Sequence, residues 1–223
     1  KMSDECRRDA AVGQHCLICI ARTELGQIHP SVEARQLVNA DGCVTEAKLE
    51  LSVFLTDFGW FGLLGRDEKI GRLTIGHVTS NGVREEIGQH VATHSDGESP
   101  QVNESDWLPD VRRRLERYAT GERIGFCDCQ LESPARTAFQ QHVLEVARNI
   151  PFGATMTYGA LAAKCGASRA ARAVGSVMAS NRVPIIIPCH RVIAAGSKLG
   201  GFSAPSGVQL KQQMLTMEAQ ANG

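Results

Sequence analysis

Residues 157–180 read TYGALAAKCGASRAARAVGSVMAS. The stretch contains two short helical segments, with a tight turn at Gly166 between them and Ser168 as the expected N-cap of the second. Two short helices joined around a glycine predict a helix-turn-helix. This motif is common, so it indicates the local fold more than it indicates a function.

The second predicted helix is rich in small residues. They are Ala170, Ala171, Ala173, Gly175 and Ser176. Arg169 and Arg172 stand among them, so the backbone could approach a partner closely while the arginines project. The alternative is that the small residues pack this helix tightly on a neighbouring element of the same chain.

The charge of the chain changes sign along its length, although 24 basic and 24 acidic residues cancel overall. Residues 1–145 carry 16 Lys or Arg against 23 Asp or Glu, a net charge of −7. Residues 146–223 carry 8 against 1, a net charge of +7. A one-signed half suggests a polyanionic partner such as nucleic acid. The alternative is a basic half docked on the acidic half, and charge alone favours neither.

A second informative stretch, VPIIIPCHRVI, covers residues 183–193. Its β-branched run at 185–187 predicts a strand buried in the hydrophobic core. The reactive and charged side chains that follow Pro188 do not belong in such a core. Cysteine is a nucleophile as the thiolate, which an adjacent base helps to form. Past Pro188 the chain need not be extended, so Cys189 and His190 could converge.

A histidine in this role needs its second nitrogen held, usually by a carboxylate. Glu218 is the only carboxylate in the basic half, so we expect it to orient His190 beside Cys189. A cysteine peptidase built from these three residues is an alternative. It is less favoured, because peptidase cysteine and histidine are rarely sequence neighbours and the helix-turn-helix would be unexplained.

The acidic half predicts a small antiparallel sheet followed by a long connection. LSVFLTDF (51–58) and RLTIGHV (72–78) alternate as half-buried strands do. The expected core positions are Leu51, Val53, Leu55, Leu73 and Ile75, and the expected turn residues are Gly59, Gly62 and Gly71. Residues 79–105 are polar and predict a connection that could hold a short helix.

Two longer helices are predicted next. WLPDVRRRLERYATG (107–121) has an apolar face that includes Tyr118, with Asp106 as the expected N-cap and the arginines of 112–114 on the solvated face. PARTAFQQHVLEVARNI (134–150) has a helical apolar spacing that ends before Pro151. A new domain is expected near residue 133, where the charge changes sign.

Residues 1–50 have weak periodicity and cannot be assigned. Cys16 and Cys19 have metal-ligand spacing, but a matching second pair is absent, so incidental thiols are favoured over a zinc site. The residues that could complete such a site are Cys6, His15, His29 and Cys43. No run approaches the roughly 18 apolar residues of a membrane span, and no secretory signal is evident. We expect a cytoplasmic protein with reduced cysteines and no membrane contact.

Several motifs of this chain resemble those of the O6-alkylguanine-DNA alkyltransferases, the methylated-DNA–protein-cysteine methyltransferase family. They are PCHRVI preceded by NRVPIII, RAVG, IPFGATMTYGALA, GGFS and the spacing of KQQMLTME. The resemblance is close from about 133 to 218. It is weaker from 51 to 132, where TDFGWFGLLG and LERYATGER resemble the family, and it does not reach 1–50. Non-catalytic relatives carry tryptophan at the position of Cys189, so the resemblance favours a repair enzyme over a protein that only binds alkylated DNA.

The resemblance implies an α+β fold with two domains. Residues 51–132 would form a ribonuclease-H-like α/β domain with the small antiparallel sheet. Residues 133–223 would form a mostly helical winged helix-turn-helix domain that contains the active site, and residues 1–50 stay an unassigned extension.

The resemblance also implies roles for individual residues. Cys189 would accept the alkyl group after His190 deprotonates it through a water, with Glu218 orienting His190. Asn181 would support the active-site turn, and Tyr158 would give a proton to the leaving guanine. Arg172 would fill the gap in the duplex. The remaining implied contacts are the DNA-binding residues Arg169, Ala170, Ala171 and Gly175 and the pocket residues Met178, Val192 and Ser203.

The implied function is direct repair of duplex DNA, in which the alkyl group of O6-alkylguanine moves irreversibly to the protein after the nucleotide flips out. Activity on O4-alkylthymine stays open, and a non-enzymatic protein that binds alkylated DNA is the alternative. The resemblance implies a monomer that binds the minor groove and needs neither cofactor nor metal.

The sequence departs from the family pattern near the site. Arg182 follows Asn181 where proline is usual, and Phe202 replaces the more usual tyrosine. The loop SAPSGVQLK (203–211) is two residues longer than usual and has Ala204 and Pro205 where glycine is common. These changes bear on the size of adduct that the site accepts and on the contact made by Ser203.

Overall fold

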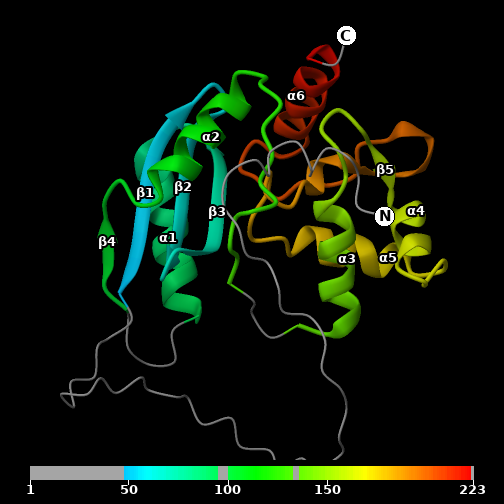
Figure 1. The fold of residues 1–223 in the computed structure, drawn as a ribbon, viewed down its shortest axis with the longest axis horizontal. Helices are drawn as coiled ribbons and strands as arrows, with labels where there is room; N and C mark the ends of the chain where they lie inside the picture. The colour runs from blue at the N-terminus through cyan, green and yellow to red at the C-terminus, as the bar shows by residue number, and fades with distance from the viewer. Residues whose placement is uncertain (1–47, 95–99, 133–135, 222–223) are drawn as a thin grey trace, which may run out of the picture. The chain divides into compact units, whose positions relative to one another are not determined.

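The computed structural model describes residues 48–94, 100–132 and 136–221 (Figure 1). The first part holds strands β1 (Leu49–Thr56), β2 (Gly59–Arg66), β3 (Lys69–His77) and β4 (Val102–Glu104) with helices α1 (Ser80–His94) and α2 (Pro109–Ala119). The second part holds α3 (Ala138–Arg148), β5 (Met156–Thr157), α4 (Tyr158–Lys164), α5 (Ala171–Ala179), the 3-10 turn η2 (Cys189–Arg191), β6 (Val192–Ile193), the turn η3 (Ala195–Ser197) and α6 (Gly207–Gln220). The predicted α+β class is confirmed.

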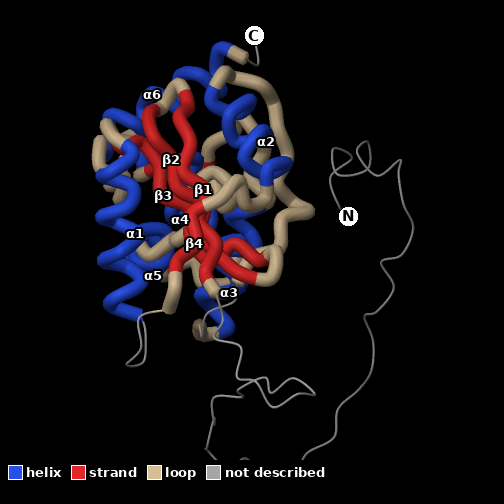
Figure 2. The backbone as a smooth tube through the Cα atoms, turned by 90° about the vertical axis from the view of Figure 1, so that its left-hand side faces the viewer, coloured by secondary structure: helices blue, strands red, loops and turns tan. Residues whose placement is uncertain are grey.

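The larger sheet is mixed, not antiparallel as the sequence predicted. β1, β2 and β3 form an antiparallel meander, and β4 joins the other edge parallel to β1, in the order β3-β2-β1-β4. β4 has three residues, of which only Asn103 is half-buried. So short a strand shows no alternation of apolar and polar residues, which is why the sequence pattern did not predict it. Figure 2 shows this sheet between α1 on one side and α2 on the other.

Two details of the predicted strands are wrong. Leu55 is 58% exposed, so the buried face of β1 that includes Leu51 and Val53 ends before it. Gly62 and Gly71 lie inside strands, while the β2–β3 turn is made by Asp67 and Glu68. Gly62 serves close packing, since a Cβ there would come within 2.4 Å of Val83 Cγ1 on α1.

The connection 79–105 contains a 15-residue helix, longer than the short helix that its polarity suggested. Its sequence is polar on most sides, and only Val83, Ile87 and Val91 are buried. These residues recur every fourth position, as one narrow stripe on a helix does. The stripe packs on Leu49, Leu51 and Leu64 of the sheet, so three apolar residues suffice to hold α1 in place.

Two predicted N-caps are also wrong. α2 begins at Pro109 after Leu108, and the Asp106 carboxylate accepts a hydrogen bond from Arg112 at 2.7 Å instead of capping the helix. α5 begins at Ala171 without a side-chain cap, so Ser168 lies in the preceding turn. In α2, Arg113 is exposed as predicted, whereas Arg112 and Arg114 are half-buried in ion pairs. α3 has a capping box formed by Thr137 and Gln140, and it ends at Arg148.

The β-branched run before the cysteine is not a strand. Residues 183–187 form turns, in which Ile185 has a φ of 69° and the Ile187 N–H donates to the Val183 carbonyl. Prolines at 184 and 188 lack the N–H groups that a sheet ladder needs, which explains the failed prediction. The run is buried as predicted, and it joins one core with residues of the sheet, α2, α3 and α6.

The described residues of both halves thus share a hydrophobic core, and the expected boundary near 133 stays a prediction. No described helix is long and apolar enough to cross a membrane.

Candidate active site

The Cys-His-Arg sequence is buried, contrary to the expectation that such side chains stay out of the core. Cys189, His190 and Arg191 are 6%, 0% and 7% exposed, and they form the 3-10 turn η2. The predicted departure from an extended chain after Pro188 is therefore confirmed. Burial of a charged or reactive group requires compensating partners. For His190 and Arg191, one carboxylate, that of Glu218, supplies them.

Glu218 lies on α6 and is completely buried. Its Oε1 accepts from His190 Nε2 at 2.9 Å and from Arg191 Nη2 at 2.9 Å, while Oε2 accepts from the Gly153 N–H at 3.0 Å. Burial alone would raise the pKa of this carboxyl. The hydrogen bonds from His190 and Arg191 and the charge of Arg191 outweigh burial and hold the pKa well below its usual range. Glu218 is therefore ionised and paired with Arg191.

His190 is set up as a neutral base. Burial lowers the pKa of its imidazole, and the opposing effect of Glu218 is smaller. A neutral ring bonded to a carboxylate through Nε2 carries its proton there, which leaves a lone pair on Nδ1. That Nδ1 atom is buried and has no hydrogen-bond partner among the described residues. It is thus available to accept a proton, directly or through a water.

Cys189 is a thiol at rest. Burial raises its pKa, while a hydrogen bond with Asn181 and the charge of Lys211 act in the opposite direction. A buried thiol needs a nearby base to become a nucleophile. The neutral His190 beside it in the chain can serve as that base.

Asn181 braces the turn that precedes the cysteine. Its Nδ2 donates to the Ile187 carbonyl at 2.8 Å, and its Oδ1 accepts from the Val183 N–H at 3.2 Å. The two bonds tie both ends of the turn to one amide side chain. The supporting contacts expected of Asn181 are present.

Tyr158 is the first residue of α4, which begins after the Thr157 N-cap. Burial raises the pKa of its phenol, and a negative charge on Cys189 raises it further. Gly200 abuts the ring, because a Cβ there would lie 2.9 Å from the Tyr158 hydroxyl. A tyrosine with a raised pKa stays protonated and can donate.

The residues expected to meet DNA lie on or beside α5. Arg169 and Arg172 are exposed, and neither guanidinium has a hydrogen-bond partner among the residues that the structure describes. A Cβ on Gly175 would meet nothing within 4 Å. Packing inside the chain therefore does not require a glycine at that position, and the alternative of tight intramolecular packing loses its support there. Of the expected pocket residues, Met178 and Val192 are buried and Ser203 is exposed.

The sequence analysis did not identify three residues that belong to this arrangement. Tyr118 from α2 is fully buried and donates its hydroxyl to Glu218 Oε1 at 2.6 Å. Arg191 pairs with the same carboxylate. Lys211 is 1% exposed, and its Nζ donates to the Val192 carbonyl at 2.7 Å. Lys211 stands two helical turns before Glu218 on the buried face of α6, a spacing that could have revealed it.

No group of three or more metal-binding side chains occurs among the described residues. Cys16 and Cys19, with the residues that could complete a zinc site, lie outside the described part of the chain.

Several known proteins are similar to this chain in sequence. The family described as 6-O-methylguanine DNA methyltransferase, DNA binding domain, matches residues 138–220. A methylated-DNA–protein-cysteine methyltransferase of Methanosarcina acetivorans is 40% identical over 117 residues, which are 52% of this chain and 72% of that protein. One from Mycobacterium tuberculosis is 36% identical over 162 residues, or 68% of this chain and 88% of that protein.

Solved structures show a similar fold. The structure of Mycobacterium tuberculosis OGT in complex with DNA has a TM-score of 0.61 at 27% identity, and the match covers 77% of this chain and 94% of that chain. The O6-methylguanine-DNA methyltransferase of Pyrococcus kodakaraensis has a TM-score of 0.58 at 26% identity, covering 76% and 98%.

Proposed function

Because the chain belongs to the methylated-DNA–protein-cysteine methyltransferase family, we propose that it repairs DNA by moving the alkyl group of O6-alkylguanine to its own Cys189. The observation that carries the proposal is the neutral His190, which follows Cys189 directly in the chain, is held through Nε2 by Glu218, and has no hydrogen-bond partner at Nδ1 among the described residues. Such a pair can deprotonate a buried thiol without a metal.

The transfer step balances with the residues present. His190 Nδ1 takes the thiol proton, and the Cys189 sulfur attacks the alkyl carbon while the bond from that carbon to O6 breaks. The electron pair of the broken bond goes to the guanine ring, which takes a proton from Tyr158. The product is a thioether, which offers water no acyl carbon to attack, so each chain reacts once.

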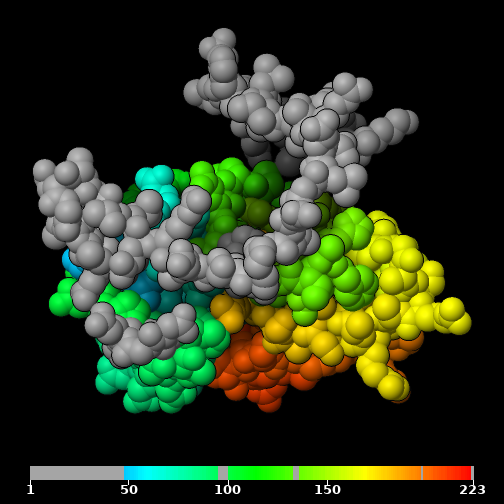
Figure 3. Space-filling view, turned by 90° about the horizontal axis from the view of Figure 1, so that it is seen from below, coloured from blue at the N-terminus to red at the C-terminus, as the bar shows by residue number. Residues whose placement is uncertain are grey.

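The finer fold and binding features belong to the same proposal. Residues 51–132 would be the ribonuclease-H-like domain and 133–223 the winged helix-turn-helix domain, with β5 and β6 as the short sheet beside α4 and α5. Such a protein would act as a monomer on the minor groove. A lesion inside the duplex is reached by flipping the nucleotide, and Arg172 would occupy the gap that remains. In Figure 3 the surface of the α4–α5 region, in yellow, lies at one end of the visible face, open to a large partner.

The proposal is tested by measuring the intact mass of the protein after incubation with duplex DNA that contains O6-methylguanine. One methyl group per chain is expected, located by peptide mapping on Cys189, and further lesion should give no second addition. A protein that only binds alkylated DNA would keep its original mass. A hydrolase would release product over several turnovers without a lasting mass gain.

The role of Arg172 predicts a difference between two substrates. Arg172→Ala should slow repair of a lesion in duplex DNA by about tenfold or more, since a flipped state costs a few kcal/mol. Reaction with the free alkylated base should be unchanged, because that base needs no flipping. Single-turnover rates on both substrates measure this, with Arg113→Ala as the control for an exposed arginine on another helix. Equal losses on both substrates would contradict the role given to Arg172.

A further inference from the structure

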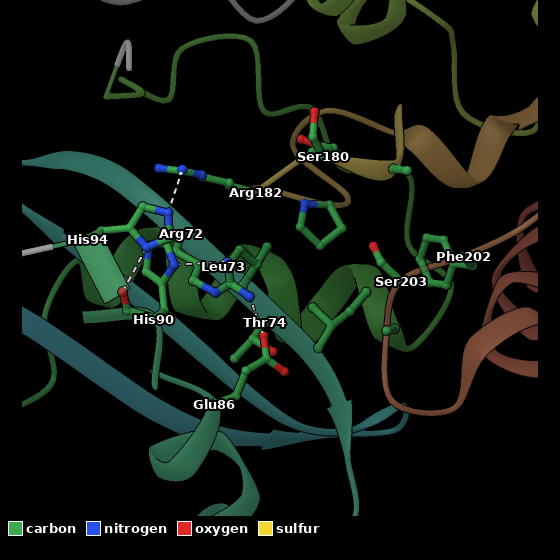
Figure 4. Close-up of a pocket in the computed structure, with 15 residues that line it drawn as sticks. Arg72, Leu73, Thr74, Glu86, His90, His94, Ser180, Arg182, Phe202 and Ser203 are labelled. Carbon is green, nitrogen blue, oxygen red and sulfur yellow. Dashed lines mark hydrogen bonds and ion pairs between the residues drawn. The ribbon is translucent and has the colours of Figure 1, made fainter. Parts of the chain in front are cut away.

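A cavity of about 270 Å³ lies beside the active-site turn, between β3, α1, the end of α5 and residues 202–204. Figure 4 shows Arg72, His90, His94 and Arg182 gathered along one side of it. Neither Cys189 nor His190 lines this cavity, so it is separate from the reacting groups. Arg182 stands where the family usually has proline, and the proposed function gives it no task.

The cavity carries an excess of positive charge. Glu86 is the only carboxylate among the described residues of its lining, and it already bonds to Arg72 Nη2 at 2.5 Å and to His77 Nε2 at 3.1 Å. Arg182 bonds through Nη2 to His94 Nε2 at 3.0 Å and has no carboxylate partner among the described residues. One of the two guanidinium charges is thus left without a counter-ion.

The two histidines do not supply that negative charge, and each accepts a hydrogen bond from one of the arginines. Arginine only donates, so His94 Nε2 must accept from Arg182, and His94 Nδ1 then donates to the His90 carbonyl at 2.9 Å. His90 Nδ1 likewise accepts from Arg72 Nη1, at 3.4 Å. Burial, followed by the charges of Arg72, His94 and Arg182, lowers the pKa of His90 to about 4.

A donor in the lining is also unsatisfied. The Nε atom of Arg72 is buried and has no hydrogen-bond partner within the part of the chain that the structure describes. Buried donors are almost always paired, so an unpaired N–H at this position indicates room for an acceptor from a bound ligand. Arg72 and Arg182 are brought together by the backbone, because the N–H of Leu73, next to Arg72, donates to the Arg182 carbonyl at 2.8 Å.

We propose that this cavity binds a phosphate group, held by Arg72 and Arg182. The lining offers an uncompensated guanidinium and an unsatisfied N–H, and its one carboxylate is already engaged, so it suits an oxyanion and not a cation. Arg182 directly follows Asn181, which braces the turn before Cys189. An anion that fixes Arg182 therefore also fixes the position of this brace.

The phosphate can come from a DNA backbone or from a free phosphate compound, and the first test does not depend on the proposed function. Inorganic phosphate is titrated into the full chain while the ring signals of His90 and His94 are followed by NMR. Both sets of ring signals should shift saturably as phosphate is added, whereas chloride at matched ionic strength should have no such effect. Arg182→Gln should weaken phosphate binding at least tenfold, Arg182→Lys should weaken it less, and the exposed-site control Arg113→Gln should not change it.

Absence of a saturable response, or an equal response in Arg182→Gln, would overturn the proposal. The second test measures the salt dependence of duplex binding. If a DNA phosphate occupies the cavity, Arg182→Gln should reduce the slope of log affinity against log salt by about 1. If the slope is unchanged while inorganic phosphate still binds the unaltered chain, the ligand is a free phosphate compound. Neither result depends on whether Cys189 accepts an alkyl group.

Discussion

Cys189→Ser is expected to leave the protein folded and to abolish alkyl transfer. The substitution keeps the size of a side chain that is 6% exposed, so the core should tolerate it. A serine hydroxyl is a far weaker nucleophile than a thiol at neutral pH, and a neutral His190 activates it less readily. The single-turnover rate on duplex O6-methylguanine should fall by more than roughly 10³-fold.

The matched control is Cys165→Ser, in the turn between α4 and α5. Burial raises the pKa of the Cys165 thiol, and no described residue provides a base that is hydrogen-bonded to it. This variant should transfer the alkyl group at the rate of the unaltered protein. Duplex binding by Cys189→Ser should also be retained, which a gel-shift assay can verify. Residual methylation of the Cys189→Ser chain at any other cysteine would assign the chemistry to that residue.

Glu218→Gln should impair both activity and stability. The amide keeps the shape but removes the charge that stabilises a protonated His190, so alkyl transfer should slow by about 10²–10⁴-fold. It also leaves the buried Arg191 guanidinium without its carboxylate, a loss of about 3–5 kcal/mol in the free energy of unfolding. Transfer rates across pH and urea denaturation measure the two effects.

Tyr118→Phe is the control that separates a lost hydrogen bond from a lost charge. It removes one donor to Glu218 and leaves the ion pair with Arg191, so it should cost only about 1 kcal/mol. If Glu218→Gln destabilises no more than Tyr118→Phe and leaves the pH dependence of Cys189 alkylation unchanged, Glu218 has no part in the mechanism.

His190 and Glu218 together fix the direction in which the stability of the protein changes with pH. The pKa of His190 is lowered on folding, so below its unfolded pKa of about 6.5 the unfolded chain binds a proton that the folded chain does not. The pKa of Glu218 is also lowered, and its contribution is lost as pH falls below the unfolded value of about 4.3. Both effects destabilise the protein in acid, and Glu218→Gln should remove the second.

The sequence by itself identified the cluster of Cys189, His190 and Glu218 and predicted the local helices. Glu218 was identified because it is the single carboxylate of the basic half, and the structure places it 2.9 Å from His190 Nε2. α4 and α5 follow from their helical segments and the turn at Gly166, whose φ is 73°. These features depend on residue type and short-range spacing, which a sequence displays directly.

Only the tertiary structure decided what surrounds Cys189, His190 and Glu218. Tyr118 reaches Glu218 across 100 residues, and the Leu73–Arg182 hydrogen bond joins β3 to the active-site turn. The turns at 183–187 replaced a predicted strand, and they leave that run buried all the same. The periodicity of apolar residues predicts which side chains are buried, but it does not predict which distant groups form hydrogen bonds with the buried polar ones. Those partners are chosen when the sheet, α2 and α6 pack into one core, because most buried polar groups then need a donor or acceptor within reach.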